Sequence, residues 1–196
     1  MKKLILLIVF SNCLLAEGFG EKLAQAAMVR TTMSIIYDGS YHRLEYPGGD
    51  VPENIGVCTD LIIRSYRKFG IDLQVLVHED MKRNFSKYPA RWGLKKPDKN
   101  IDHRRVPNLR RLFERNGAEI PFSDKLENYK TGDLVTWNVL GRPHIGIVSD
   151  YKTEEGERPL FIHNIGRGPE LMDFFDAFER TGHYRFHPTT QGNRAD

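Results

Sequence analysis

The sequence predicts an α+β domain in which N-terminal helices pack on a small antiparallel β-sheet. Helical spacing of apolar residues dominates roughly the first 116 positions, and β-rich runs separated by turns dominate the remainder. The hydrophobic share of 40% is typical of a globular chain, and no repeat or low-complexity linker divides the sequence. We therefore expect a signal peptide over residues 1–18 and a single domain over residues 19–196.

The first residues have the pattern of a secretory signal peptide. Lys2 and Lys3 precede a 13-residue run, Leu4 to Ala16, that is apolar except at two positions. This run is too short to cross a bilayer, which takes ~20 residues. Cleavage after residue 16 or 18 would place the protein in the periplasm or outside the cell, with membrane contact only through the signal peptide. An uncleaved interfacial anchor and lipidation at Cys13 are the alternatives.

The charge pattern gives little support to nucleic-acid binding. Without Lys2 and Lys3 the net charge falls from +3 to +1, and no long basic run remains.

Helices are expected where apolar residues recur at helical spacing. Pro107 suits the first turn of the last helix, and Gly70 and Gly117 suit helix ends. The intervening residues 37–57, with a short extended piece at 41–46, and the basic, proline-punctuated residues 86–105 are expected to be loops. The expected helices span residues 21–36, 58–69, 72–85 and 106–116.

The second half is expected to form the sheet. Its β-rich runs are separated by turns, and one interruption at residues 173–180 has the spacing of a short helix. The expected strands span residues 133–137, 145–149, 160–163 and 183–187.

Cys58 is the first candidate for chemistry. Once the signal peptide is removed it is the lone cysteine, so it cannot form a disulfide within the chain. It follows a loop and opens a predicted helix, where free N–H groups and the helix dipole favour an anion. This position predicts a depressed thiol pKa and a nucleophilic thiolate. The alternative is a small, inert core residue.

His144 is the candidate base. The turn before it delivers His144 to the start of a strand, on the same face as Gly146, which leaves room for a neighbouring group. A neutral imidazole there could accept the thiol proton and later protonate a leaving amine. The alternative is a polar residue satisfied at a strand end.

Three further residues complete the candidate site. His163 and Asn164 close the next strand, and only one of them can face His144 and fix its tautomer. We expect His163 to do so, because Asn164 precedes a turn that its side chain can cap. Tyr46 could donate a hydrogen bond to an oxyanion, and packing is the alternative role. Because no HExxH motif or close histidine pair is present, no metal or cofactor is expected.

These motifs resemble those of the NlpC-type papain-like peptidoglycan hydrolases. In that group a cysteine opens a helix, a GDLV-like strand follows, the next strand carries HxGI, and a polar residue stands on the strand after it. The matching stretches are GVCTDLIIRSY, TGDLVTW, PHIGIVSD and FIHN. The resemblance implies a papain-like fold, with Cys58 as nucleophile, His144 as base, His163 as the orienting residue and Tyr46 near the oxyanion. It also implies hydrolysis of an amide bond in the peptide stem of peptidoglycan.

The sequence resembles still more closely the DUF1287 family, a domain of unknown function in secreted bacterial proteins. The shared phrases cover residues 30 to 187 and include DVPENIGVCTDLIIRSYR, LVHEDM, HIGIVSD, IHNIGRGP and GHYRF. The loop 86–105 and the insertion Lys152 to Pro159 depart from the NlpC-type pattern, so the bond cleaved is not specified. Two other functions stay open: a catalytically silent wall-binding domain, and a thiol amidase or acyltransferase acting on another exported substrate, including use as an antibacterial toxin. The sequence identifies no immunity or regulatory partner.

Overall fold

The computed structural model describes residues 18–188, and the predicted signal peptide lies almost entirely outside this range. In the part of the chain so described, no helix is long and apolar enough to cross a membrane.

The helices and strands follow one another in two blocks, as expected for an α+β chain. Four α-helices come first, with a two-residue parallel pair, β1 and β2, inserted between the first two of them. The helices are α1 (Phe19–Val29), α2 (Cys58–Arg67), α3 (Leu73–Asn84) and α4 (Val106–Arg115), and the pair is β1 (Ile36–Tyr37) and β2 (Ile55–Gly56). Single 3-10 turns are η1 (Arg30–Thr32), η2 (Phe85–Lys87), η3 (Asp102–Arg104) and η4 (Leu126–Asn128).

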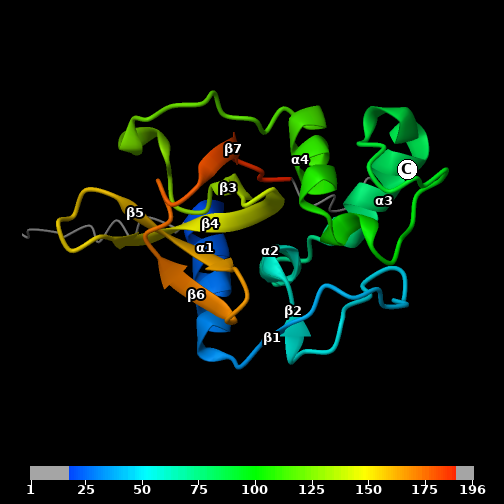
Figure 1. Cartoon of the computed structure of the whole chain (residues 1–196), viewed down its shortest axis with the longest axis horizontal. Coiled ribbons are helices and arrows are strands. Elements are labelled where there is room, and N and C mark those ends of the chain that lie inside the picture. The colour runs from blue at the N-terminus through cyan, green and yellow to red at the C-terminus, as the bar shows by residue number, and fades with distance from the viewer. Residues whose placement is uncertain (1–17, 189–196) are drawn as a thin grey trace, which may run out of the picture.

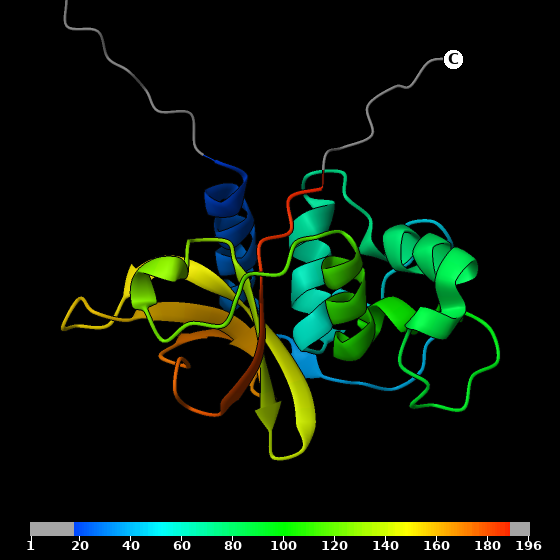
Figure 2. The ribbon, with the colours of Figure 1, turned by 90° about the horizontal axis from the view of Figure 1, so that it is seen from above.

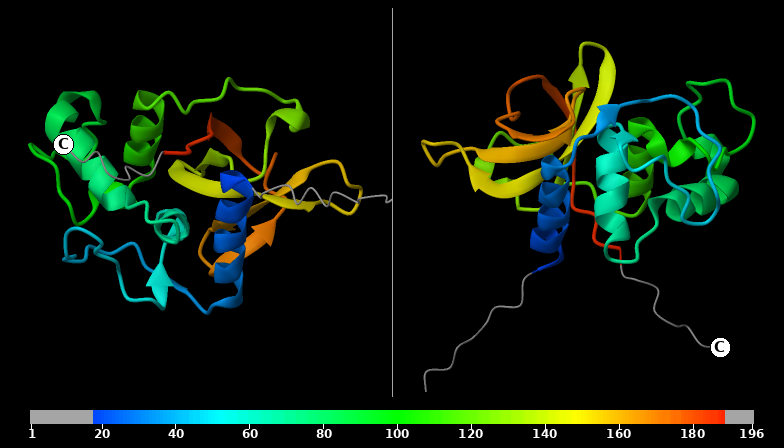
Figure 3. Two further views of the ribbon diagram at one scale, coloured as in Figure 1. Left: turned by 180° about the vertical axis from the view of Figure 1, so that it is seen from behind. Right: turned by 90° about the horizontal axis from the view of Figure 1, so that it is seen from below.

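The second block is one antiparallel sheet. Its strands are β3 (Leu134–Val139), β4 (Arg142–Lys152), β5 (Pro159–Asn164), β6 (Pro169–Met172) and β7 (Glu179–Tyr184). They lie in the order β6-β5-β4-β3-β7, so the long strand β4 is central. Figure 1 and Figure 2 show the sheet on one side and α3 and α4 on the other, with α2 between them. Figure 3 shows α1 lying along the sheet, where it contacts both β4 and α2.

Each face of the sheet buries its own apolar cluster. On one face Ile145, Ile147 and Ile162 pack with the helices in the larger core. On the other face Trp137 and Phe161 join a smaller cluster that the segment after β6 covers. Because alternate residues of a strand point to opposite faces, the odd-numbered isoleucines of β4 face the helices and His144 faces the smaller cluster.

Most predicted elements are confirmed, with shifted ends. The helices at 58–69, 72–85 and 106–116 and the strands at 133–137, 145–149 and 160–163 all exist. Gly70 and Gly117 follow their helices with φ of 72° and 66°, the left-handed conformation that a glycine tolerates without strain. The first helix ends earlier than expected, since residues 30–32 tighten into a 3-10 turn.

Three predictions were wrong. Residues 173–180 form no helix: their aromatic side chains pack on the sheet instead, and β7 begins at Glu179, earlier than the expected strand at 183–187. Residues 41–46 form no strand. The stretch 86–105 is not wholly a surface loop, because η3 is buried between α2, α3 and α4.

Candidate active site

Cys58 is the first residue of α2, at the point where the loop from β2 enters the helix. The N–H groups of Cys58 itself and of Thr59 approach its sulfur, as expected for a helix N-terminus. A third N–H comes from Ile145 in β4, the residue directly after His144. The fold therefore brings the Cys58 sulfur to the strand that carries the candidate base, although 86 positions separate the two residues in the sequence.

The thiol is less acidic than the sequence predicted. Cys58 is only 4% exposed, and this burial raises the pKa of its thiol to about 12. Three N–H donors favour the thiolate, but desolvation outweighs them and the nearby Asp60 carboxylate adds to the rise in pKa. The expected depression of the Cys58 pKa is therefore wrong for this structure, in which burial keeps the sulfur as a thiol at neutral pH.

The two predicted histidines meet directly. His163 lies opposite Gly146 in the β4–β5 register, diagonal to His144 on the same face. The Nε2 atom of His144 lies 3.1 Å from Nδ1 of His163, at hydrogen-bond distance, and the two rings are nearly perpendicular. Burial lowers the pKa of His144 to about 3 and that of His163 to about 4, so both rings are neutral at physiological pH.

Gly146 and Phe174 enclose the histidine pair. A Cβ atom at Gly146 would lie 3.1 Å from the Cβ of His163, so any larger residue would press on that side chain. The ring of Phe174 packs 4.2 Å from the His163 ring and 5.6 Å from the His144 ring, centroid to centroid. As a result His144 is 4% exposed and His163 is fully buried.

Asn164 has the turn-capping role that the sequence predicted. Its side-chain oxygen accepts the N–H of Gly166 at 3.1 Å, which closes the turn after β5. Its amide nitrogen donates to the Gly56 carbonyl at 3.4 Å and so ties β5 to the loop that enters α2. The geometry favours His163 over Asn164 as the partner of His144.

Tyr46 contacts α3, whereas Tyr37 lies near Cys58. The Tyr46 hydroxyl donates to Glu79 of α3 at 2.9 Å, and its ring packs on His78. Tyr37 instead pairs with Gly56, two residues before Cys58, and burial together with the nearby Cys58 raises the pKa of Tyr37 to about 12. The assignment of Tyr46 to the oxyanion is therefore corrected. The sequence carried no clear signal for Tyr37, because a two-residue strand has no periodicity to detect.

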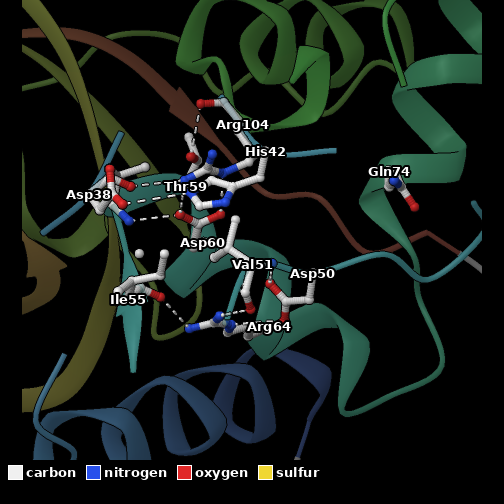
Figure 4. A network of polar contacts seen from close by, with 12 residues as sticks. Asp38, His42, Asp50, Val51, Ile55, Thr59, Asp60, Arg64, Gln74 and Arg104 are labelled. Atoms are coloured by element: carbon white, nitrogen blue, oxygen red, sulfur yellow. Dashed lines mark hydrogen bonds and ion pairs between the residues drawn. The ribbon is translucent and has the colours of Figure 1, made fainter. Parts of the chain in front are cut away.

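Two buried arginines hold the loop that positions Cys58 (Figure 4). Arg104 of η3 donates to both carboxylate oxygens of Asp60 at 2.8 and 2.9 Å, and also to the Asp38 carbonyl. Asp60 in turn accepts the Val57 N–H at 2.7 Å, which caps the start of α2. Arg64, one turn further on, donates to four carbonyls of residues 51–55. The helix start is thus fixed from both sides.

No three histidine, cysteine or acidic side chains within residues 18–188 are grouped so as to hold a metal ion.

The fold and these side chains define an α+β domain with a buried thiol at the start of α2, next to the strand that carries a histidine pair. The chain belongs to the DUF1287 family, a domain of unknown function, whose model matches residues 24–186. It is 47% identical over 165 residues to "Uncharacterized protein YijF" of Escherichia coli (strain K12), an alignment that covers 84% of this chain and 80% of that relative. No solved structure matches the chain.

Proposed function

We propose that this protein is a cysteine hydrolase of amide bonds, with Cys58 as nucleophile, His144 as base and His163 as the residue that orients the base. The observation that carries the proposal is the junction at β4. The Ile145 N–H reaches the Cys58 sulfur, and the adjacent His144 is bound to His163 at 3.1 Å. If Cys58 were only an inert core residue, its burial would not explain why the adjacent strand carries a buried pair of imidazoles.

The chemistry follows from one tautomer of the pair. If Nε2 of His144 carries the proton and donates to Nδ1 of His163, Nδ1 of His144 is left as an acceptor. That nitrogen takes the Cys58 proton as the sulfur attacks the carbonyl carbon, and later gives it to the leaving amine. Water then cleaves the thioester and releases the acid. His163 stabilises the imidazolium that forms at each proton transfer.

Tyr37 is the proposed donor to the oxyanion. Tyr37 lies in β1, which pairs with β2 two residues before Cys58. The residue is 43% exposed, so its hydroxyl can contact a bound substrate. A phenol whose pKa is raised keeps its proton and can donate it in a hydrogen bond to developing negative charge.

The proposed substrate is the peptide stem of peptidoglycan, and the proposed fold is papain-like. Support comes from the resemblance to NlpC-type hydrolases, from a cysteine helix packed against an antiparallel sheet, and from the predicted export. The proposed location is the periplasm or the cell exterior.

Digestion of purified sacculi tests this proposal. The mature protein should release soluble fragments with new amino termini, detected by mass spectrometry. Cys58→Ala and His144→Ala should each abolish release while keeping the wild-type circular dichroism spectrum. Because the two residues act as one unit, the double variant should be little worse than either single one. Full activity in Cys58→Ala would refute the mechanism. Binding to sacculi without cleavage would support the silent wall-binding alternative.

A further inference from the structure

Arg30 is a buried cation whose nearest carboxylates, among them Asp50 and Glu53, lie beyond ion-pair distance. It is the first residue of η1, directly after α1, and is only 7% exposed. Within residues 18–188 its guanidinium forms no ion pair within 4.0 Å, and its Nη2 atom has no hydrogen-bond partner. Arginine is rarely buried unless it is paired, because an unpaired charge loses its hydration without compensation. This side chain therefore suggests a missing anionic partner.

Arg30 faces a hollow with an excess of positive charge. The hollow measures about 430 Å³ and lies between the end of α1, the loop after Gly49 and the last turns of α2. Its charged lining consists of four cations, Arg30, Arg64, Arg67 and Lys68, and two carboxylates, Asp50 and Glu53.

Most of the other polar groups in the lining are already engaged. The Asp50 carboxylate is shared between Arg64 at 2.9 Å and Arg67 at 3.2 Å. The remaining N–H groups of Arg64 are bound by loop carbonyls, as Figure 4 shows. By contrast, Nε of Arg67 is buried without a partner, like Nη2 of Arg30. Two residues that line the hollow, Arg30 and Arg67, therefore each carry one buried N–H group without a partner, and Lys68 is exposed beside them.

We propose that this hollow binds a small oxyanion, of the carboxylate or phosphate class, through Arg30, Arg67 and Lys68. Guanidinium N–H groups form their strongest hydrogen bonds with such oxygens, whereas a cation or an apolar group would leave both donors unpaired. The site is separate from the candidate active site, because Arg67 lies nine residues along α2 from Cys58, about 14 Å at 1.5 Å per residue. The loop that forms its wall also leads to Cys58, so a bound anion would stiffen the approach to the nucleophile.

Anion titration of the mature protein tests this site. Inorganic phosphate and succinate are added separately, with ionic strength held constant by sodium chloride. The melting temperature and the Nε–H signals of arginine in ¹⁵N NMR are followed. We expect at least one anion to raise the melting temperature saturably and to shift the Arg30 and Arg67 signals. A response to phosphate alone assigns the phosphate class, and a response to succinate alone assigns the carboxylate class.

Variants separate the site from a general salt effect. Arg30→Met keeps the apolar stem and should weaken the apparent affinity at least tenfold, and Lys68→Gln should weaken it severalfold. Arg83→Gln removes an exposed cation from α3, and should respond like the wild type. If neither anion gives a saturable response, or if Arg30→Met binds like the wild type, the proposal is wrong. Should Arg30→Met not fold, a wild-type response in Lys68→Gln together with unmoved Arg30 and Arg67 signals would overturn it equally.

Discussion

Gly146→Ala should disturb the histidine pair without removing any of the proposed catalytic side chains. A Cβ atom at position 146 would lie 3.1 Å from the His163 Cβ, 3.1 Å from the Ile162 carbonyl oxygen and 3.4 Å from the Trp137 ring. Ordinary contacts of this kind are 3.4 Å or longer, so β5 must retreat by a few tenths of an ångström.

This movement of β5 lengthens the hydrogen bond between the His144 and His163 rings. The His144–His163 distance is 3.1 Å, and a further few tenths bring it to the limit at which a hydrogen bond fails. Overpacking a buried site of this kind costs about 1–3 kcal/mol of unfolding free energy. Loss of orientation at the base should lower kcat by about 10- to 100-fold, since a 1 Å misplacement can cost 10²-fold.

Gly39→Ala is the matched control. A Cβ at Gly39 would meet only the Val57 side chain, at an ordinary 3.6 Å, although Val57 directly precedes Cys58. This variant should be neutral or up to about 1 kcal/mol more stable, because alanine lowers the entropy of the unfolded chain. Urea unfolding gives the stability of both variants, sacculus digestion gives kcat, and ¹⁵N NMR reports the histidine tautomers. Wild-type stability and unchanged histidine signals in Gly146→Ala would show that Gly146 is not needed to hold the His144–His163 pair.

Two further predictions concern stability. Burial lowers the pKa of His144 to about 3 and the pKa values of His103 and His163 to about 4, so these rings stay neutral in the folded protein but protonate near pH 6.5 once it unfolds. The unfolding free energy should therefore be at its full value above pH 6.5 and fall by about 1.4 kcal/mol per pH unit per histidine down to about pH 4. Urea unfolding midpoints of the wild type and of His103→Gln across this range measure the slope. A free energy that does not change with pH would contradict the prediction. Separately, Arg104→Met should cost about 3–5 kcal/mol because it leaves the buried Asp60 carboxylate unpaired, and adding Asp60→Asn should recover part of that loss. A loss below 1 kcal/mol in urea unfolding would show that the pair is not needed.

The sequence predicted those parts of the fold that local patterns specify. The start of α2 at Cys58 and the glycines that end α2 and α4 depend on residues adjacent in the chain. Residues 173–180 were predicted to be helical because their apolar spacing fits a helix. In the structure Phe174 and Phe175 face the sheet, and burial against Trp137 and Phe161 overrides the local preference.

For the candidate site, too, the sequence predicted only what depends on neighbouring residues. His163 could be chosen over Asn164 from strand alternation and turn chemistry, which are local properties. Tyr37 could not be chosen over Tyr46, because its place beside Cys58 depends on two residues pairing across the loop to Gly56. The pKa of Cys58 was predicted in the wrong direction, since the helix N-terminus is visible in the sequence and the desolvation by packing is not.

That reversal leads to a last prediction, on the protonation state of the nucleophile. With the Cys58 pKa at about 12 and the His144 pKa at about 3, a neutral thiol and a neutral imidazole coexist across the whole neutral range. A preformed thiolate–imidazolium pair would instead make the sulfur reactive from acidic pH upwards. Alkylation of the folded protein by iodoacetamide should therefore be slow at pH 7 and still rise about tenfold per pH unit at pH 10, while the same chain in urea reaches its plateau above the ordinary pKa of ~8.5. A folded-state pKa below 8.5 would show that the sulfur is ionised despite its burial. An inert core cysteine would give the same profile, so activity decides between the two; if Cys58 is the nucleophile, its proton must leave during attack on the substrate, and a neutral, well-oriented His144 is then indispensable.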